Sequence, residues 1–214
     1  MWYGVALAQP QNYQEILQRG IVPGRDIRIA FGDANIGRCL LAAPHGGGIE
    51  PGTSELLRAV AELGNWAWYE FAGFLRKGNR ENLYLASNQF DEPTLLGLLP
   101  KAGIVVTLHG SQEMSGPVVG IGGTWSTGRG ALIPAINATT AAHGLRAEES
   151  ASGSDPKCLA NRGRLGQGIQ IELSRAARNL LFPPDCSREA RGRRTPAFAA
   201  LAKAIHTSLK QVAS

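Results

Sequence analysis

The segment RCLLAAPHGGGIEPGTSELLRAVAELGN (residues 38–65) contains the succession of elements that decides the fold. Its first part, RCLLAAP (38–44), is an apolar run typical of a buried strand, and GTSELLRAVAELGN (52–65) carries apolar residues at helical spacing. Thr53 or Ser54 is expected to cap this helix. Three glycines lie between the strand and the helix, and their conformational freedom permits a tight turn. The segment therefore predicts a strand, a turn and a helix in direct succession.

The same alternation continues along the chain. Further strands are expected at 25–32, 66–74, 81–87, 103–111, 117–123 and 166–173, and further helices at 91–102, 128–145, 174–182 and 195–212. Strands that alternate with helices are typical of α/β proteins. We therefore expect a single α/β domain over residues 1–214, a sandwich of helices around a central mixed, largely parallel sheet.

The composition is that of a globular protein with a mild excess of positive charge. Of the 214 residues, 43% are hydrophobic and 18% are charged, which argues against disorder, and the formal net charge is +5. An excess of this size favours anionic partners in general, such as a nucleic acid or a carboxylate-rich substrate, and is equally compatible with no polyanionic partner.

Cysteine spacing and the N-terminal segment exclude several classes. Cys39, Cys158 and Cys186 are widely spaced and form no CxxC pair, so neither a disulfide framework nor a thiolate zinc site is expected. The N-terminus lacks the basic and apolar regions of a signal peptide. No apolar run approaches the roughly 20 residues of a membrane span. We expect a soluble, cytoplasmic protein that leaves the producing cell, if at all, by lysis.

Polar side chains stand where the predicted strands end. His45 directly follows the first quoted strand, Glu50 lies on the turn after it, and His109 lies near the end of the apolar strand GIVVTLHGS. Catalytic zinc takes three protein ligands and leaves the fourth position to water. His45 and Glu50 can supply a close pair and His109 a distant third ligand, although a histidine and a glutamate beside a glycine turn are also compatible with an ordinary loop.

Glu172 lies within the apolar run GIQIEL, where burial of an unpaired charge is costly. A functional role, as the free base of the site, is favoured over a structural one. The structural alternative is an ion pair with a nearby arginine such as Arg175 or Arg178.

The blocks PHGGGIEPGTSEL, FDEP, VTLHG and NRGRLGQGIQIELS, in this order, are similar to the poly-γ-glutamate hydrolase family. This resemblance covers most of the chain up to residue 182 and implies a compact, zinc carboxypeptidase-like fold. It implies a Zn²⁺-dependent amidohydrolase that cuts the γ-linked amide of poly-γ-glutamate. His45, Glu50 and His109 then look like the zinc ligands, and Glu172 looks like the catalytic glutamate.

A γ-glutamyl chain carries one free α-carboxylate per unit, so a cationic cleft is expected. Arg162 and Arg164 are the candidate carboxylate contacts because a guanidinium holds a carboxylate with two parallel hydrogen bonds, and Asn161 is expected to assist. The alternative for both arginines is a solvated loop.

Two other functions compete with this interpretation. The first alternative is a nucleic-acid-binding replication accessory protein, with which the net charge and the basic run SREARGRR (187–194) are compatible. No recognisable binding motif accompanies this charge. The other alternative is a zinc amidase for peptidoglycan or another γ-linked peptide. We favour the poly-γ-glutamate enzyme, acting as a monomer on an anionic γ-linked substrate, with no membrane or nucleic-acid partner.

Overall fold

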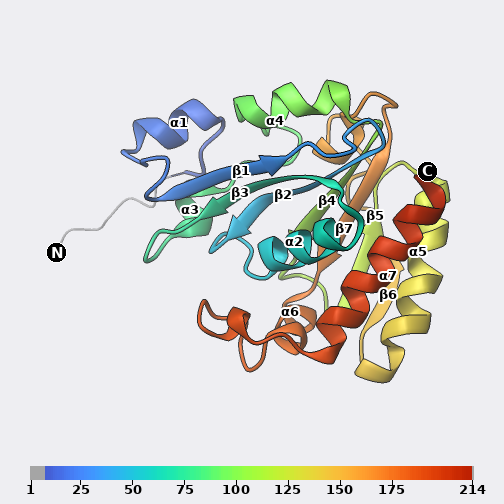
Figure 1. Cartoon of the computed structure of the whole chain (residues 1–214). Coiled ribbons are helices and arrows are strands. Elements are labelled where there is room, and N and C mark those ends of the chain that lie inside the picture. Colours follow the sequence, from blue (N-terminus) through green and yellow to red (C-terminus); the bar gives the residue numbers. More distant parts are fainter. Residues whose placement is uncertain (1–7, 214) are drawn as a thin grey trace.

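The strand that contains His45 lies near the middle of a mixed sheet in the computed structural model, which describes residues 8–213 (Figure 1). Among these residues, seven strands pair in the order β1-β3-β2-β4-β7-β5-β6. Their bounds are β1 Ile27–Gly32, β2 Cys39–Gly47, β3 Ala67–Gly73, β4 Ile104–Gly110, β5 Val118–Gly122, β6 Arg146–Glu149 and β7 Gly168–Leu173. The β3–β2, β2–β4, β4–β7 and β5–β6 pairs are parallel, and the β1–β3 and β5–β7 pairs are antiparallel.

Helices cover both faces of this sheet (Figure 1). One apolar core joins the sheet to α2 (Thr53–Gly64), α5 (Ser126–Thr140), α6 (Arg175–Leu181) and α7 (Pro196–Val212). The other joins it to α1 (Tyr13–Gln18), α3 (Asn79–Leu83) and α4 (Pro93–Leu98). Side chains alternate between the two cores along the central strands, since Val106 and Leu108 face the first and Val105 the second. This arrangement confirms the predicted α/β fold with a mixed, largely parallel sheet.

Most of the predicted elements are present, and two further elements lie where no helix or strand was expected. The strands expected at 25–32, 38–44, 66–74, 103–111, 117–123 and 166–173 correspond to β1, β2, β3, β4, β5 and β7. The helix expected at 174–182 corresponds to α6, and Ser174 caps it, because the Ser174 hydroxyl accepts a hydrogen bond from the Ala177 N–H. Helix α1 and strand β6 are additions that short, weakly patterned segments did not reveal.

The strand expected at 81–87 is wrong, because this segment begins in a helix. Helix α3 covers Asn79–Leu83 and follows Gly78, which adopts the left-handed conformation with φ of 73°. The Asn79 side chain accepts a hydrogen bond from the Leu75 N–H and donates one to the Leu75 carbonyl, which closes the preceding loop. Local side chain–backbone bonds therefore override the strand propensity of the segment.

The expected cap of α2 is also wrong, since neither hydroxyl caps the helix. Gly52 is the N-cap, the Thr53 hydroxyl donates to the Glu50 carbonyl, and the Ser54 hydroxyl accepts from the Gly47 N–H. Both side chains therefore stabilise the glycine turn that precedes the helix.

Candidate metal centre

The segment that follows β2 brings His45 and Glu50 to the same place. The pairing of β2 with β3 shifts register between Ala43 and Gly46, a bulge of the kind that re-aims a side chain. The Glu50 N–H donates to the His45 carbonyl at 2.8 Å and closes the turn. Gly47 has φ of 65°, and a Cβ there would lie 2.4 Å from the Gly73 carbonyl oxygen. The turn therefore requires glycine at this position.

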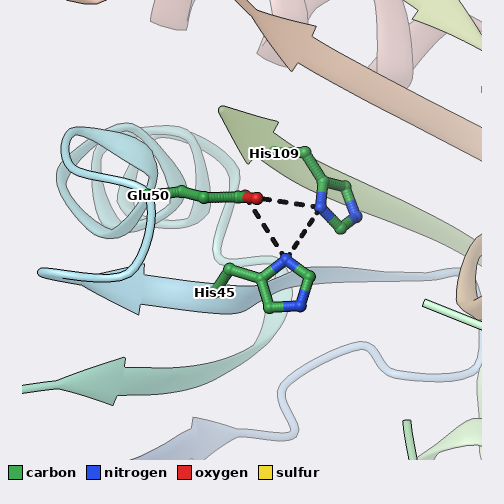
Figure 2. A group of neighbouring side chains, drawn as sticks. All are labelled: His45, Glu50 and His109. Atoms are coloured by element: carbon green, nitrogen blue, oxygen red, sulfur yellow. Dashed lines mark hydrogen bonds and ion pairs between the residues drawn. The ribbon is translucent and has the colours of Figure 1, made fainter. Parts of the chain in front are cut away.

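His45, Glu50 and His109 point toward one another from β2, its following turn and β4 (Figure 2). The Nδ1 atoms of the two histidines lie 3.1 Å apart. Glu50 Oε2 lies 3.3 Å from His45 Nδ1 and 3.4 Å from His109 Nδ1. All three side chains are buried, and they form the one cluster with metal-ligand geometry among residues 8–213. Two histidines expected at strand ends and a glutamate expected on the turn after the first strand thus converge on one point.

The donor atoms fit a tetrahedral zinc ion. Ligand distances of about 2.0–2.1 Å place the ligand atoms of such an ion about 3.3–3.4 Å apart, close to the three separations in this triangle. His45 Nε2 lies 2.7 Å from the Leu85 carbonyl, so this nitrogen donates a hydrogen bond to the carbonyl and Nδ1 is the atom that faces the cluster. Two imidazole nitrogens and a carboxylate oxygen thus face one point, which is a donor set that zinc takes in proteins.

Glu50 has additional partners that orient its carboxylate. Oε2 accepts a hydrogen bond from the Gly110 N–H at 2.9 Å, and Oε1 lies 3.3 Å from Nη1 of Arg80. Burial alone would raise the pKa of Glu50, but the charges and hydrogen bonds of His45 and His109 hold this pKa well below its usual range. The carboxylate is therefore ionised, as a metal ligand must be.

Glu172 lies beside the cluster without belonging to it. It is the Cα partner of His109 in the parallel β4–β7 ladder and is half-buried. Its Oε2 accepts a hydrogen bond from the Ser152 hydroxyl at 2.6 Å, and its Oε1 accepts one from the Gln170 amide at 3.1 Å. Within the described chain no ion pair joins it to Arg175 or Arg178, the alternative that the sequence left open. Two neutral donors hold this carboxylate at the edge of the cluster.

Tyr84 and Arg80 form a wall of the site that the sequence did not indicate. The Tyr84 ring stacks on His45 with a centroid separation of 4.2 Å, and the Arg80 guanidinium lies 4.6 Å from the Tyr84 ring centroid. Burial raises the pKa of Tyr84, with further contributions from the charges of Glu50 and Glu172, while Arg80 opposes them. The ring thus lies within the electrostatic range of both carboxylates. The sequence did not indicate these residues because a strand, and not a helix, was expected at 81–87.

Asn161, Arg162 and Arg164 do not join the cluster. The Asn161 amide donates to the carbonyls of Gly153 and Asp155, a structural role within its loop. The Arg162 guanidinium donates to the Phe90 carbonyl at 2.7 Å.

Arg164 is exposed and lies at the opposite end of β4 from His109. Its backbone N–H donates to the Ala102 carbonyl, which precedes the first residue of β4. The parallel strand direction thus separates Arg164 from the site by the length of β4.

The chain matches known proteins over most of its length. The model of the family described as poly-gamma-glutamate hydrolase matches residues 11–204. Two relatives from Bacillus subtilis (strain 168) are each 35% identical: the SPbeta prophage-derived UPF0714 protein YoqZ, over 68% of this chain, and the UPF0714 protein YndL, over 67%. These matches span 52% of YoqZ and 56% of YndL, so the chain covers about half the length of these relatives.

Two solved structures share the fold closely. A bacteriophage poly-gamma-glutamate hydrolase has a TM-score of 0.87 at 30% identity, covering 96% of this chain and 98% of that one. The zinc-free apo form of YndL has a TM-score of 0.81 at 27% identity, covering 95% of this chain and 98% of that one.

The described helices bear on one further expectation. None of them is long and apolar enough to cross a membrane. The interpretation of the N-terminus as lacking a signal peptide falls partly on residues 1–7, which lie outside the described residues.

Proposed function

The chain belongs to the poly-gamma-glutamate hydrolase family, and we propose that it is a zinc-dependent amidohydrolase that cleaves γ-glutamyl amide bonds in poly-γ-glutamate. The observation that carries this proposal is the buried triangle of His45 Nδ1, Glu50 Oε2 and His109 Nδ1. A carboxylate that is not part of the triangle, Glu172, lies beside it on the neighbouring strand. Catalytic zinc sites typically combine three protein ligands with a separate base, and this resemblance in arrangement supports the proposal.

His45, Glu50 and His109 would hold the zinc ion in this proposal. The ion, when bound, lowers the pKa of water toward about 7 and polarises the scissile carbonyl. The Leu85 carbonyl fixes the His45 tautomer, and the Gly110 N–H together with Arg80 fixes the Glu50 carboxylate. Hydrogen bonds with neighbouring groups thus orient at least two of the three ligands.

Glu172 would serve as the general base and then as the general acid. One carboxylate oxygen accepts the proton of the attacking water and later delivers it to the leaving amine nitrogen. The hydrogen bonds from Ser152 and Gln170 hold the carboxylate in one orientation without neutralising its charge. The absence of an ion pair, within the described residues, leaves this carboxylate available as a base.

The site also has the charge that a polyanionic substrate requires. The Arg80 side chain is 39% exposed and touches both Glu50 and the Tyr84 ring, so part of its guanidinium remains available to solvent at the edge of the triangle. A guanidinium at this position can hold a substrate carboxylate or the oxygen of the scissile amide.

The test is metal analysis of the purified protein followed by product analysis on three substrates. We expect about one zinc per chain and release of γ-linked glutamate oligomers from poly-γ-glutamate, with no cleavage of α-linked polyglutamate or of cell-wall peptides. Cleavage of cell-wall peptides alone would establish the peptidoglycan alternative. Absence of hydrolysis by the zinc-loaded protein on all three substrates would refute the proposal.

A further inference from the structure

A second polar pocket adjoins the metal centre on the side of Glu50 and Gly110. Its volume is about 80 Å³, and its wall includes Arg80, Arg175 and Arg178. Neither histidine of the metal centre lines it. Glu50 and Arg80 therefore contact both the triangle and this second space, which we call the arginine pocket.

Arg178 is a buried cation that forms no ion pair with any residue between 8 and 213. Arg178 is 6% exposed, and within the described part of the chain its terminal nitrogens donate to the carbonyls of Pro51 and Ser111, at 3.2 and 3.3 Å. Its Nε is buried and has no hydrogen-bond partner among the described residues. Carbonyl dipoles do not neutralise a guanidinium, and a buried charge without a partner is costly. A site on this guanidinium is therefore open to an anion.

The other charges around the pocket favour an anion as well. Arg175 is exposed at the pocket wall, and Arg80 contributes another guanidinium, which is half-exposed. Burial lowers the pKa of Arg178, the charges of Arg175 and Arg80 lower it further, and the charge of Glu50 opposes them. Asp185, also at the wall, accepts a hydrogen bond from the Ser187 N–H of its own turn. Positive charge thus exceeds negative charge in this space.

We propose that the arginine pocket binds a free carboxylate of the γ-glutamyl substrate, an assignment that rests on the proposed function. Liquid water occupies roughly 30 Å³ per molecule, so the volume suits a group of two or three non-hydrogen atoms. Every unit of a γ-linked glutamate chain carries such a carboxylate. Because Glu50 separates the pocket from the triangle, the bound carboxylate belongs to a unit next to the bond that is cleaved.

The substrate test compares two γ-linked glutamate oligomers of equal length, one with free α-carboxylates and one with primary amides in their place. The variants are Arg175→Gln, at an exposed position, and Arg178→Lys, which keeps the charge but loses the fork. Arg146→Gln on β6, an exposed arginine far along the sheet from the pocket, is the matched control. We expect the two pocket variants to lose about tenfold to a hundredfold in kcat/KM on the acid oligomer and much less on the amide. Equal losses on both oligomers, or none, would overturn the proposal.

Calorimetric binding separates this proposal from the proposed function and from a phosphate site. The zinc-loaded protein is titrated with the acid oligomer, with glutarate and with inorganic phosphate, after circular dichroism has shown that each variant is folded. If the wild type cleaves neither oligomer, selective binding of the acid oligomer that weakens in Arg175→Gln still supports the pocket, and equal binding of acid and amide overturns it. Binding of phosphate alone, weakened by the same substitutions, overturns the carboxylate assignment.

Discussion

Glu172 and His109 are Cα partners in the parallel ladder between β7 and β4. Because partners in register project to the same face, the carboxylate lies beside the imidazole while Ile171 and Leu173 pack into the opposite core. Ser152 and Gln170 supply its hydrogen bonds. This geometry separates the proposed base from the ligand triangle and leads to the first prediction.

Glu172→Gln should retain zinc and the fold yet lose most of its turnover. The amide keeps the size of the side chain but cannot accept the proton, and general acid–base catalysis typically contributes about 10²–10⁴-fold. Steady-state hydrolysis and metal content of the same preparation measure both effects. Loss of zinc would make Glu172 a ligand, and near-normal turnover would make it structural.

Ser152→Ala should lower kcat by about tenfold with little change in metal content, because it removes the hydrogen bond that orients Glu172. Ser150→Ala is the control and should have a smaller effect, since the Ser150 hydroxyl contacts Ser152 and makes no described bond to Glu172. Combination with Glu172→Gln distinguishes positioning from general destabilisation. If Ser152→Ala is as harmful in the Gln background as alone, it does not act through the carboxylate.

His45→Ala or His109→Ala should bind zinc far more weakly than the wild type, because each removes one of three ligands. His143→Ala is the matched control, an exposed histidine at the end of the segment after α5. Metal stoichiometry after dialysis against a weak chelator gives the readout. Full retention of the ion in either ligand variant would contradict the assignment.

Arg162→Ala should affect stability more than substrate binding, because its guanidinium is engaged by the Phe90 carbonyl. The expected loss is about 1 kcal/mol in the free energy of unfolding. Arg80→Ala, in contrast, should raise KM for a polyanionic substrate, since its guanidinium lies at the edge of the triangle. Urea unfolding and kinetics on both variants test the difference, and a large KM effect in Arg162→Ala alone would restore the role expected from the sequence.

Glu70 on β3 should make the fold sensitive to acid. Its burial alone would raise its pKa, but hydrogen bonds from Ser54 and Arg58 and the charges of Arg28 and Arg58 lower it. A lowered pKa stabilises the fold above the unfolded value of about 4.3, and this contribution is lost as the pH falls through the lower folded value.

Glu70→Gln should therefore reduce the free energy of unfolding by about 1–3 kcal/mol at pH 7. The difference from the wild type should stay constant down to about pH 5 and shrink in more acidic solution. Urea unfolding at a series of pH values measures it. A difference that does not depend on pH would show that the carboxylate charge is not involved.

The sequence by itself determined the strand–turn–helix of residues 38–65 and the positions of the three residues of the triangle. Apolar periodicity and glycine act locally, so these elements are predictable from neighbouring residues. The proximity of His45 and His109 is predictable because parallel neighbouring strands end at the same edge of the sheet, where α/β proteins place their sites.

Only the tertiary structure decided which residues surround the triangle. The neighbouring residues come from segments whose path depends on partners far away in the chain: Arg80, Tyr84, Ser152 and Arg178. For example, Arg178 donates a hydrogen bond to the Pro51 carbonyl, 127 positions away. The same reason explains Arg162, whose guanidinium bonds to a carbonyl 72 positions away. It also explains Arg164, which lies in the loop before β7 and bonds to the segment before β4, at the opposite end of that strand from His109. Short-range patterns do not contain such long-range hydrogen bonds, because their geometry exists only once the sheet has assembled.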